Sequence, residues 1–182
     1  MQLCVAIVHY HLNPGGVTRV IQHQVRSLQN HGGRTVVLAG QQPMEQFEFG
    51  PLGKTAIIKG LGYETTQQNI KAEQLLKQMQ QYAYKILGKK PDIWHFHNHS
   101  LGKNATLPLV VHLLAATGNQ VLLQIHDFAE DGRPGNYTYL KKKLTNQNIP
   151  FDNLLYPSSS NVHYALINSL INLAYFRPIK VA

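Results

Sequence analysis

The sequence predicts an α/β fold in which a three-layer, doubly wound, mostly parallel sheet forms a single domain over residues 1–182. Two observations carry this prediction. Short β-rich runs alternate with longer helical patterns, and strands that alternate with helices pair in parallel through right-handed crossovers. In addition, 43% of the 182 residues are hydrophobic and only 14% are charged, which suits a packed domain and not a disordered chain.

The first half of the chain supplies three strands and two helices. Apolar periodicity predicts strands over residues 3–9, 34–39 and 55–59, and helices over 17–30 and 68–87. In the helix over 17–30, apolar residues recur three or four positions apart and therefore share one face. Together with the strand before it, this helix makes the first strand–helix unit.

The second half of the chain repeats the same period. It predicts strands over 92–96, 120–125, 154–156 and 163–167, and helices over 104–117, 137–146 and 169–175. In doubly wound sheets, ligands bind beyond the carboxyl ends of the strands. Function is therefore expected in the loops that lead from a strand into the next helix.

Three of these loops have an unusual composition. They are HLNPGG after the first strand, HNHSLGKN after the fourth and HDFAEDGRPGNY after the fifth. Each contains polar, glycine and histidine residues that a plain connection does not need. The candidate site residues come from these three loops.

The sequence also indicates a cytoplasmic protein. The longest strongly apolar stretch, residues 107–116, is half of the roughly 20 residues that a membrane-spanning helix needs. No secretory leader is recognisable at the N-terminus, and a lone cysteine, Cys4, fits a reducing compartment. The formal net charge of +8 attracts anions without choosing among them, so peripheral contact with the inner face of an acidic membrane stays open.

Gly15 and Gly16 stand between the first predicted strand and the first helix. Glycines there let the backbone approach an anion, and the helix N-terminus presents free N–H groups to it. This arrangement suits a diphosphate group, although a tight turn that needs a positive φ explains the glycines equally well. The spacing G-x-G-x-x-G of dinucleotide-binding proteins is absent there.

A near match to that spacing occurs later in the chain. Gly60 and Gly62 are followed by Thr65 in place of the third glycine, and Tyr82 stands where an acidic residue would hold a ribose. Binding of a nicotinamide cofactor is therefore disfavoured. We expect no cofactor.

His95, His97 and His99 alternate at the end of the fourth predicted strand. If the strand continued through all three, they would project from one side of the sheet, as in a metal site. A metal-dependent hydrolase of the barrel class would need further histidines and an aspartate at other strand ends, usually in about 250 residues. The favoured alternative has His95 packed in the sheet while His97 and His99 emerge at its end and contact a polar ligand. No metal is expected.

His126 is the strongest single indication of a site. It follows the apolar run VLLQI at the end of a central strand, beside a loop with Asp127, Glu130, Arg133 and Asn136. An imidazole can donate to a sugar hydroxyl or a phosphate, or exchange protons near neutral pH, and a nearby carboxylate can orient it. A helix N-terminus, which favours acidic residues, explains Glu130 but not His126.

Several segments, taken in order, resemble one family. PGGVTRVIQHQVRSLQNHGGRTVVLAG contains a double-glycine turn, a helix and a glycine before the next strand, and DIWHFHNHS and VLLQIHDF follow as the fourth and fifth strands. This order is similar to that of the retaining bacterial glycosyltransferases with two facing Rossmann domains, glycosyl transferase group 1 of the GT-B type. The resemblance covers nearly the whole chain and implies a Rossmann-like N-terminal domain, the N-terminal half of a GT-B fold.

The resemblance also implies roles for individual residues. Gly15 and Gly16 would approach the donor diphosphate, and His126 would be the catalytic residue that contacts the transferred sugar. The acceptor pocket would be shaped by seven residues: His97, Asn98, His99, Asp127, Glu130, Arg133 and Asn136. In this family the N-terminal domain serves mainly the acceptor and the C-terminal domain holds the donor nucleotide.

The chain has no counterpart of the acidic donor-binding motif of that family. The resemblance therefore implies that the C-terminal donor-binding domain is absent from this chain and that the chain alone is inactive. The complete enzyme would transfer a hexose from a nucleotide-sugar donor to a carbohydrate or lipid-linked acceptor, with retention of configuration. No nucleic acid partner is expected. A non-catalytic module that binds a glycan or an anionic surface stays open as the alternative, and a metal-dependent hydrolase is less favoured.

Overall fold

The chain forms a six-stranded sheet with helices around it, and the computed structural model describes residues 2–42, 54–64 and 70–167. The strands are β1 (Cys4–His9), β2 (Arg34–Ala39), β3 (Lys54–Ile57), β4 (Ile93–His97), β5 (Val121–Ile125) and β6 (Val162–Leu166). The helices are α1 (Gly16–Asn30), α2 (Ala72–Leu87), α3 (Thr106–Ala116), α4 (Pro134–Leu144) and α5 (Phe151–Leu155), and a 3-10 turn, η2 (Lys59–Leu61), follows β3.

All neighbouring strands pair in parallel, in the order β3-β2-β1-β4-β5-β6. From β1 the chain moves outward through β2 to β3, and then returns to place β4 on the other side of β1. Ile7 of β1 stands opposite Val37 on one side and His95 on the other. The strand order therefore reverses between β1 and β4, which is where doubly wound sheets bind ligands.

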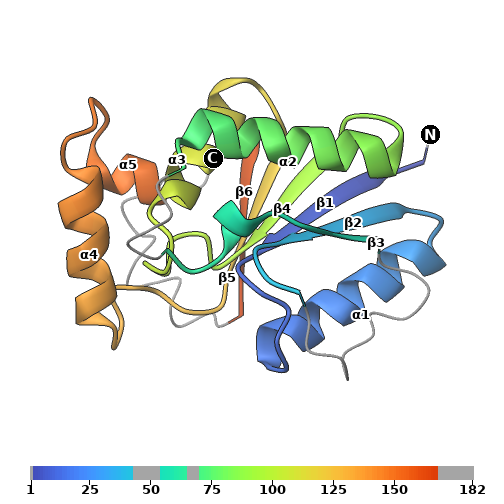
Figure 1. The fold of residues 1–182 in the computed structure, drawn as a ribbon, viewed down its shortest axis with the longest axis horizontal. Coiled ribbons are helices and arrows are strands. Elements are labelled where there is room, and N and C mark those ends of the chain that lie inside the picture. Colours follow the sequence, from blue (N-terminus) through green and yellow to red (C-terminus); the bar gives the residue numbers. More distant parts are fainter. Residues whose placement is uncertain (1, 43–53, 65–69, 168–182) are drawn as a thin grey trace.

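Helices cover both faces of the sheet, which confirms the predicted three-layer α/β fold (Figure 1). α2 and α3 lie side by side on one face, and α1 lies on the other. Beneath α1, buried apolar side chains of the helix and the sheet form one cluster that includes Val5, Ile7, Ile21, Val25 and Val37.

The larger part of the core lies between the sheet and the pair α2 and α3. Trp94 and Phe96 of β4 point into it, and Leu75 and Met79, four residues apart on α2, pack in the same cluster. Each of these side chains is at most 1% exposed. Removal of one such side chain from water contributes roughly 1.5–3 kcal/mol, so this cluster fixes α2 on the sheet.

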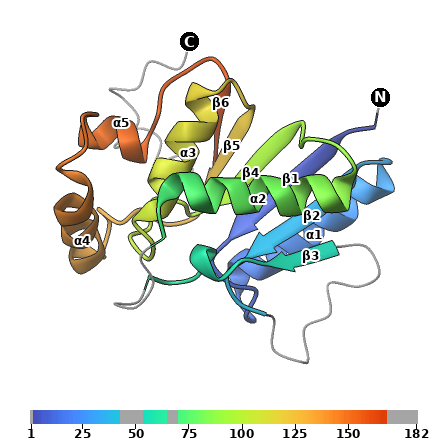
Figure 2. The same ribbon diagram turned by 45° about the horizontal axis from the view of Figure 1, so that its top comes forward.

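α4 and α5 lie together at one end of the molecule, beyond α3 (Figure 2). Leu140 and Leu144 of α4 pack with Leu154 and Leu155 of α5. The predicted strand over 154–156 is therefore wrong, because Leu154 and Leu155 belong to a helix. These two adjacent leucines are both fully buried, whereas a strand would direct them to opposite faces. An apolar run this short does not distinguish a strand from a buried helical turn.

The other described elements match the predicted ones with small shifts at their ends. α4 begins at Pro134, earlier than the predicted start at 137, because proline suits the first turn of a helix. β3 ends at Ile57, before the predicted end at 59, because the chain turns into η2. The predicted helix over 169–175 lies outside the described residues, as do residues 68 and 69.

In the parts of the chain that the structure describes, no helix is both long and apolar enough to cross a lipid bilayer.

Candidate functional site

Three of the strands bring their carboxyl ends to the same edge of the sheet. His9 ends β1, His97 ends β4, and His126 directly follows β5. Because β4 lies between β1 and β5, the three loops with unusual composition begin side by side. The site is therefore built at the reversal of strand order, as the sequence predicts.

A row of histidine rings runs along this edge. His97 Nδ1 and His126 Nε2 are 2.9 Å apart, and their rings stack with centroids 5.2 Å apart. His95 stacks on His97 with centroids 4.6 Å apart. On the other side, the ring of His9 lies 6.2 Å from that of His97 and 5.5 Å from that of His11. These five imidazoles, from His11 to His126, form one continuous histidine row.

The hydrogen bond between His97 and His126 indicates where His126 carries its proton. His97 Nε2 is buried and has no hydrogen-bond partner within the described residues. A buried N–H without an acceptor is rarer than a buried acceptor without a donor. His97 is therefore best assigned a proton on Nδ1, which donates to His126 Nε2. His126 then holds its own proton on Nδ1 and can donate it to a ligand.

Burial keeps the histidine row neutral near pH 7. Desolvation lowers the pKa of both His9 and His95 to about 4, and it lowers the pKa of His97 well below its usual value. Burial also lowers the pKa of His126, while the neighbouring Asp127 carboxylate acts in the opposite direction. His126 is therefore a neutral hydrogen-bond donor at physiological pH.

Asn98 holds the loop after β5 against the end of β4. Its φ of 54° lies in the left-handed region, which asparagine adopts more readily than most residues. Its Oδ1 accepts hydrogen bonds from the backbone N–H of His126 at 2.7 Å and of Asp127 at 3.2 Å. Its carbonyl accepts a hydrogen bond of 2.6 Å from the Tyr10 hydroxyl. Asn98 is only 2% exposed, so in this domain it positions His126 and Asp127.

Two candidate residues of the loop after β5 reach the surface. The side chains of Asp127 and Arg133 are 46% and 43% exposed, and their charged groups form an ion pair of 3.7 Å. Asn98 Nδ2 also donates to the Asp127 carboxylate at 3.2 Å. Both charged side chains can contact a ligand above the edge of the sheet.

Two other candidates in this loop are engaged inside the domain. The Glu130 carboxylate accepts hydrogen bonds of 3.1 and 3.0 Å from the Tyr156 hydroxyl. Asn136 donates to the carbonyl of Leu101 at 2.8 Å, which joins α4 to the loop after β4. Glu130 and Asn136 therefore hold the loop in shape.

The structure separates His99 from the other alternating histidines. The chain turns at Asn98, and His99 Nε2 donates to the carbonyl of Leu155 at 2.7 Å. The three histidines therefore do not project from one side of the sheet. The expectation that His97 and His99 emerge at the end of the sheet is also wrong, since they are 1% and 0% exposed. Both rings therefore lie beneath the surface of the domain.

The described residues contain no group of three or more histidine, cysteine, aspartate or glutamate side chains placed to hold one metal ion. In the histidine row, His95, His97 and His126 stack face to face. His97 Nδ1 and His126 Nε2 are hydrogen-bonded to each other.

Gly15 and Gly16 open α1 at the same edge of the sheet. Gly15 is the N-cap with an extended φ of 169°, so the explanation by a positive φ is wrong. Thr18 donates to the carbonyl of Asn13 at 2.6 Å and stabilises the turn. A Cβ atom at Gly16 would meet nothing within 4 Å. The glycines are exposed, and the first turn of α1 has no acidic residue to occupy its N–H groups.

Close packing explains why Gly60 and Gly62 occur in a spacing that nearly matches the dinucleotide-binding motif. A Cβ atom at Gly60 would lie 3.1 Å from the side chains of Ile70 and Leu75, and one at Gly40 would lie 1.9 Å from the backbone nitrogen of Gly62. The glycines let the ends of β2 and β3 approach each other and α2. This packing accounts for the glycines without a bound nucleotide.

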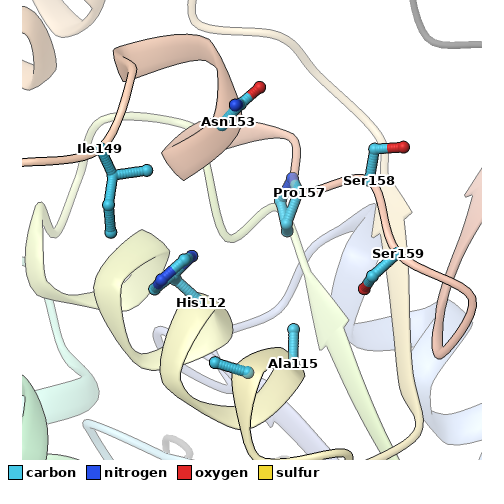
Figure 3. A pocket seen from close by; sticks show the side chains of 8 residues that line it. His112, Ala115, Ile149, Asn153, Pro157, Ser158 and Ser159 are labelled. Atoms are coloured by element: carbon cyan, nitrogen blue, oxygen red, sulfur yellow. The ribbon is translucent and has the colours of Figure 1, made fainter.

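Two cavities lie at opposite edges of the sheet. One, of about 260 Å³, lies between α3 and α5 and is lined by His112, Asn153 and Ser159 among others (Figure 3). It adjoins the segment that enters β6, at the amino edge of the sheet, and so lies away from His126. The other, of about 290 Å³, lies at the carboxyl edge between His11 and Tyr63.

Sequence reasoning missed three residues that support the site. His9 donates from Nδ1 to the carbonyl of His97 at 3.2 Å. The Tyr10 hydroxyl donates to the carbonyl of Asn98. His11 Nε2 lies 3.1 Å from the Tyr63 hydroxyl. Their position in the sequence could have identified them, because all three lie at or just after the end of β1. In a parallel sheet, residues at that position face the same edge as His126.

Comparisons with known proteins give the following results. No protein-family model matches the chain. The chain is 27% identical over 169 residues to mannosylglucosyl-3-phosphoglycerate synthase of Petrotoga mobilis, a match that covers 89% of this chain and 32% of that protein. The chain thus spans about a third of the length of this curated relative. The match supports the predicted resemblance to a glycosyltransferase.

Among solved structures, the chain is similar to the catalytic domain of starch synthase IV from Arabidopsis thaliana bound to ADP and acarbose, with a TM-score of 0.39 and 17% identity. That match covers 69% of this chain and 34% of the other chain.

Proposed function

We propose that this glycosyltransferase-like domain forms the acceptor side of an enzyme that moves a hexose from a nucleotide-diphosphate sugar to an acceptor hydroxyl, with retention of configuration. In this proposal a second domain, outside the chain, holds the donor nucleotide. The sequence match to the Petrotoga protein, which is named as a synthase of a mannosylglucosyl compound, supports sugar transfer.

The observation that carries the proposal is the placement of His126. It follows β5 at the reversal of strand order, its Nε2 is engaged by the buried His97, and its backbone is held by Asn98. A histidine that only fills the core would not need two buried residues to fix its ring and its backbone at a ligand-binding edge. The arrangement suits a hydrogen-bond donor aimed at a reacting group.

His126 acts on the transferred sugar in this scheme. Its Nδ1–H donates to a sugar hydroxyl or to an oxygen of the leaving diphosphate. A donor that is already oriented stabilises the negative charge that develops as the glycosidic bond to the diphosphate breaks. His126 stays neutral because burial lowers its pKa.

Gly15 and Gly16 approach the donor diphosphate. The N–H groups of the first turn of α1 point away from the helix and attract anions, and the glycines leave no side chain in between. The diphosphate then lies between this domain and the donor-binding one.

The remaining candidates belong to the acceptor side. Asp127 and Arg133 are exposed and contact the acceptor directly. The other residues shape the acceptor pocket from within the domain: His97, Asn98, His99, Glu130 and Asn136.

The test compares two proteins: the complete reading frame that encodes this domain, and the 182-residue chain alone. Each is incubated with nucleotide-diphosphate sugars and a panel of glycans and sugar phosphates, and the release of nucleoside diphosphate and the labelled product are measured. We expect transfer by the complete protein and none by the chain alone.

Transfer at full rate by the 182-residue chain would contradict the division between two domains. If the complete protein binds glycans but transfers no sugar, the non-catalytic binding module replaces the proposed function.

A further inference from the structure

The cavity at the carboxyl ends of β1, β2 and β3 has a lining of its own, and we refer to it as the Tyr63 pocket. His11 follows β1, Gln41 follows β2, and Lys59 and Tyr63 follow β3. The backbones of Gly40 and Gly62 meet at its base. At about 290 Å³, it lies at the small end of the range of ligand pockets.

Positive charge gathers around this pocket. Lys59 is part of its lining, and Lys103 Nζ lies 5.3 Å from the centre of the Tyr63 ring. Burial raises the pKa of Tyr63, and the positive charge of Arg133 acts against that rise, which places Arg133 in the same neighbourhood. Lys59 and Lys103, from two different loops, therefore lie beside Tyr63, while Arg133 is paired with Asp127.

No acidic residue is among the described residues that line the Tyr63 pocket. Glu64, the next residue along the chain, is engaged elsewhere. Its carboxylate accepts a hydrogen bond of 3.0 Å from the N–H of Ala105 and lies 3.6 Å from Lys143 Nζ. The positive charges at the pocket are thus not balanced by Glu64.

The hydroxyl of Tyr63 is oriented as a donor. His11 Nδ1 accepts a hydrogen bond of 3.3 Å from the N–H of Asn13, so this nitrogen carries no proton. Burial lowers the pKa of His11 and keeps the ring neutral, so its proton is on Nε2. Nε2 lies 3.1 Å from the Tyr63 oxygen and donates to it. The hydroxyl proton of Tyr63 is then available to an acceptor in the pocket.

We propose that the Tyr63 pocket binds an anionic group, a phosphate or a carboxylate, on the acceptor molecule. Lys59 and Lys103 supply positive charge, and Tyr63 donates a hydrogen bond. This inference deepens the proposed function, because it names the chemical class of the acceptor.

Two contacts connect the Tyr63 pocket with the site around His126. Tyr10, which also lines the pocket, donates to the carbonyl of Asn98, and Asn98 accepts from the backbone of His126. The rings of His11 and His9 begin the histidine row that ends at His126. An acceptor held by its anionic group in the pocket would therefore extend along the edge of the sheet toward His126.

The test is a titration of the ¹⁵N-labelled 182-residue chain with inorganic phosphate, glucose 6-phosphate and glucose, followed by NMR. We expect saturable shifts of the amides of Gly40, Gly62 and Tyr63 with both phosphates and none with glucose. Lys59→Gln should weaken binding of glucose 6-phosphate about tenfold, equivalent to about 1.4 kcal/mol, while Lys77→Gln on the exposed surface of α2 should bind like the wild type.

The phosphate could belong to a soluble acceptor or to a lipid headgroup. Flotation with vesicles of phosphatidylcholine, with and without phosphatidylglycerol, distinguishes the two sources. Binding of the soluble sugar phosphate without flotation assigns the pocket to a small acceptor. Flotation that depends on phosphatidylglycerol and on Lys59 assigns it to a lipid headgroup. Absence of amide shifts at Gly40, Gly62 and Tyr63, or equal binding by Lys59→Gln and the wild type, overturns the inference.

The complete reading frame separates this inference from the proposed function. If it transfers sugar while Lys59→Gln leaves phosphate binding unchanged, the anionic pocket is wrong and the proposed function stands. If the pocket binds phosphate in a protein that transfers no sugar, the inferred site survives as an anion-binding site and the proposed function does not.

Discussion

Asn98 is the residue on which the arrangement around His126 depends most directly. Its side-chain oxygen is shared by the N–H groups of two consecutive residues, His126 and Asp127, at the point where β5 gives way to a loop. Asn98 also adopts the left-handed conformation at the turn that follows β4.

Replacement of Asn98 by alanine should lower the free energy of unfolding by about 3 kcal/mol. The change leaves two partly buried N–H groups without their acceptor and puts a residue with a Cβ atom but no side-chain hydrogen bond at a positive φ. Asn98→Gly should cost less than Asn98→Ala, because glycine adopts this φ freely. Urea unfolding measures both, with Asn30→Ala at the exposed end of α1 as the control; equal stability of all three variants would refute this role.

Three buried histidines make the stability of the domain depend on pH. Burial lowers the pKa of His9, His95 and His99 to about 4 in the folded chain, whereas the value in the unfolded chain is about 6.5. Below pH 6.5 the unfolded chain binds protons that the folded chain does not, so stability is complete above this pH and is lost as the pH falls toward 4.

Between about pH 7.5 and about pH 5.5, each of these histidines should cost about 1 kcal/mol of stability. Urea unfolding at both pH values measures the loss. The control His163→Gln, at an exposed position of β6, should leave the loss unchanged, whereas His99→Gln should reduce it. A stability that does not change over this range would contradict the assignment of neutral, buried rings.

The elements of the fold were predictable where their pattern is long. The buried face of α2 runs from Ala72 to Leu87 over several turns, and most residues of β1 and β5 are apolar. The segment containing Leu154 and Leu155 is too short to show a period, so sequence alone could not assign it to a helix. The turn at Asn98 likewise depends on a contact with a loop 28 residues away, which no local pattern contains.

The glycines at the ends of β2 and β3 hold these elements together. Gly40→Ala should destabilise the domain by about 3 kcal/mol or more, because its Cβ atom would lie 1.9 Å from the backbone nitrogen of Gly62 and neither backbone can yield easily. Thermal unfolding measures the effect. A variant as stable as the wild type would show that the ends of the two strands are not in close contact.

Gly16→Ala, at the start of α1, should not lower stability as Gly40→Ala does. A Cβ atom there meets nothing within 4 Å, and alanine is the better helix former, so the variant should be at least as stable as the wild type. In the complete protein, the added methyl group would stand between the first turn of α1 and the diphosphate that we propose binds there. We expect the KM for the nucleotide-sugar to rise about fivefold or more. An unchanged KM would remove Gly16 from the donor site.

At the scale of the whole molecule, the edge of the sheet joins three features. The N-terminus of α1, the histidine row and the Tyr63 pocket share the segment after β1 and also use loops after the other strands, and the parallel strands place them all at one edge. The sequence could predict this edge and His126 from the alternation of strands and helices. It could not predict that His97 and His99 are buried, because that depends on the packing of α5 and of the loop after β5.

His126 is proposed to act on the transferred sugar, and the rate of sugar transfer by the complete protein with His126→Ala tests this role directly. We expect kcat to fall about 100-fold. His163→Ala, at the amino end of β6 and the opposite edge of the sheet, should keep the wild-type rate. A His126→Ala enzyme that transfers sugar as fast as the wild type would show that His126 has no part in the transfer.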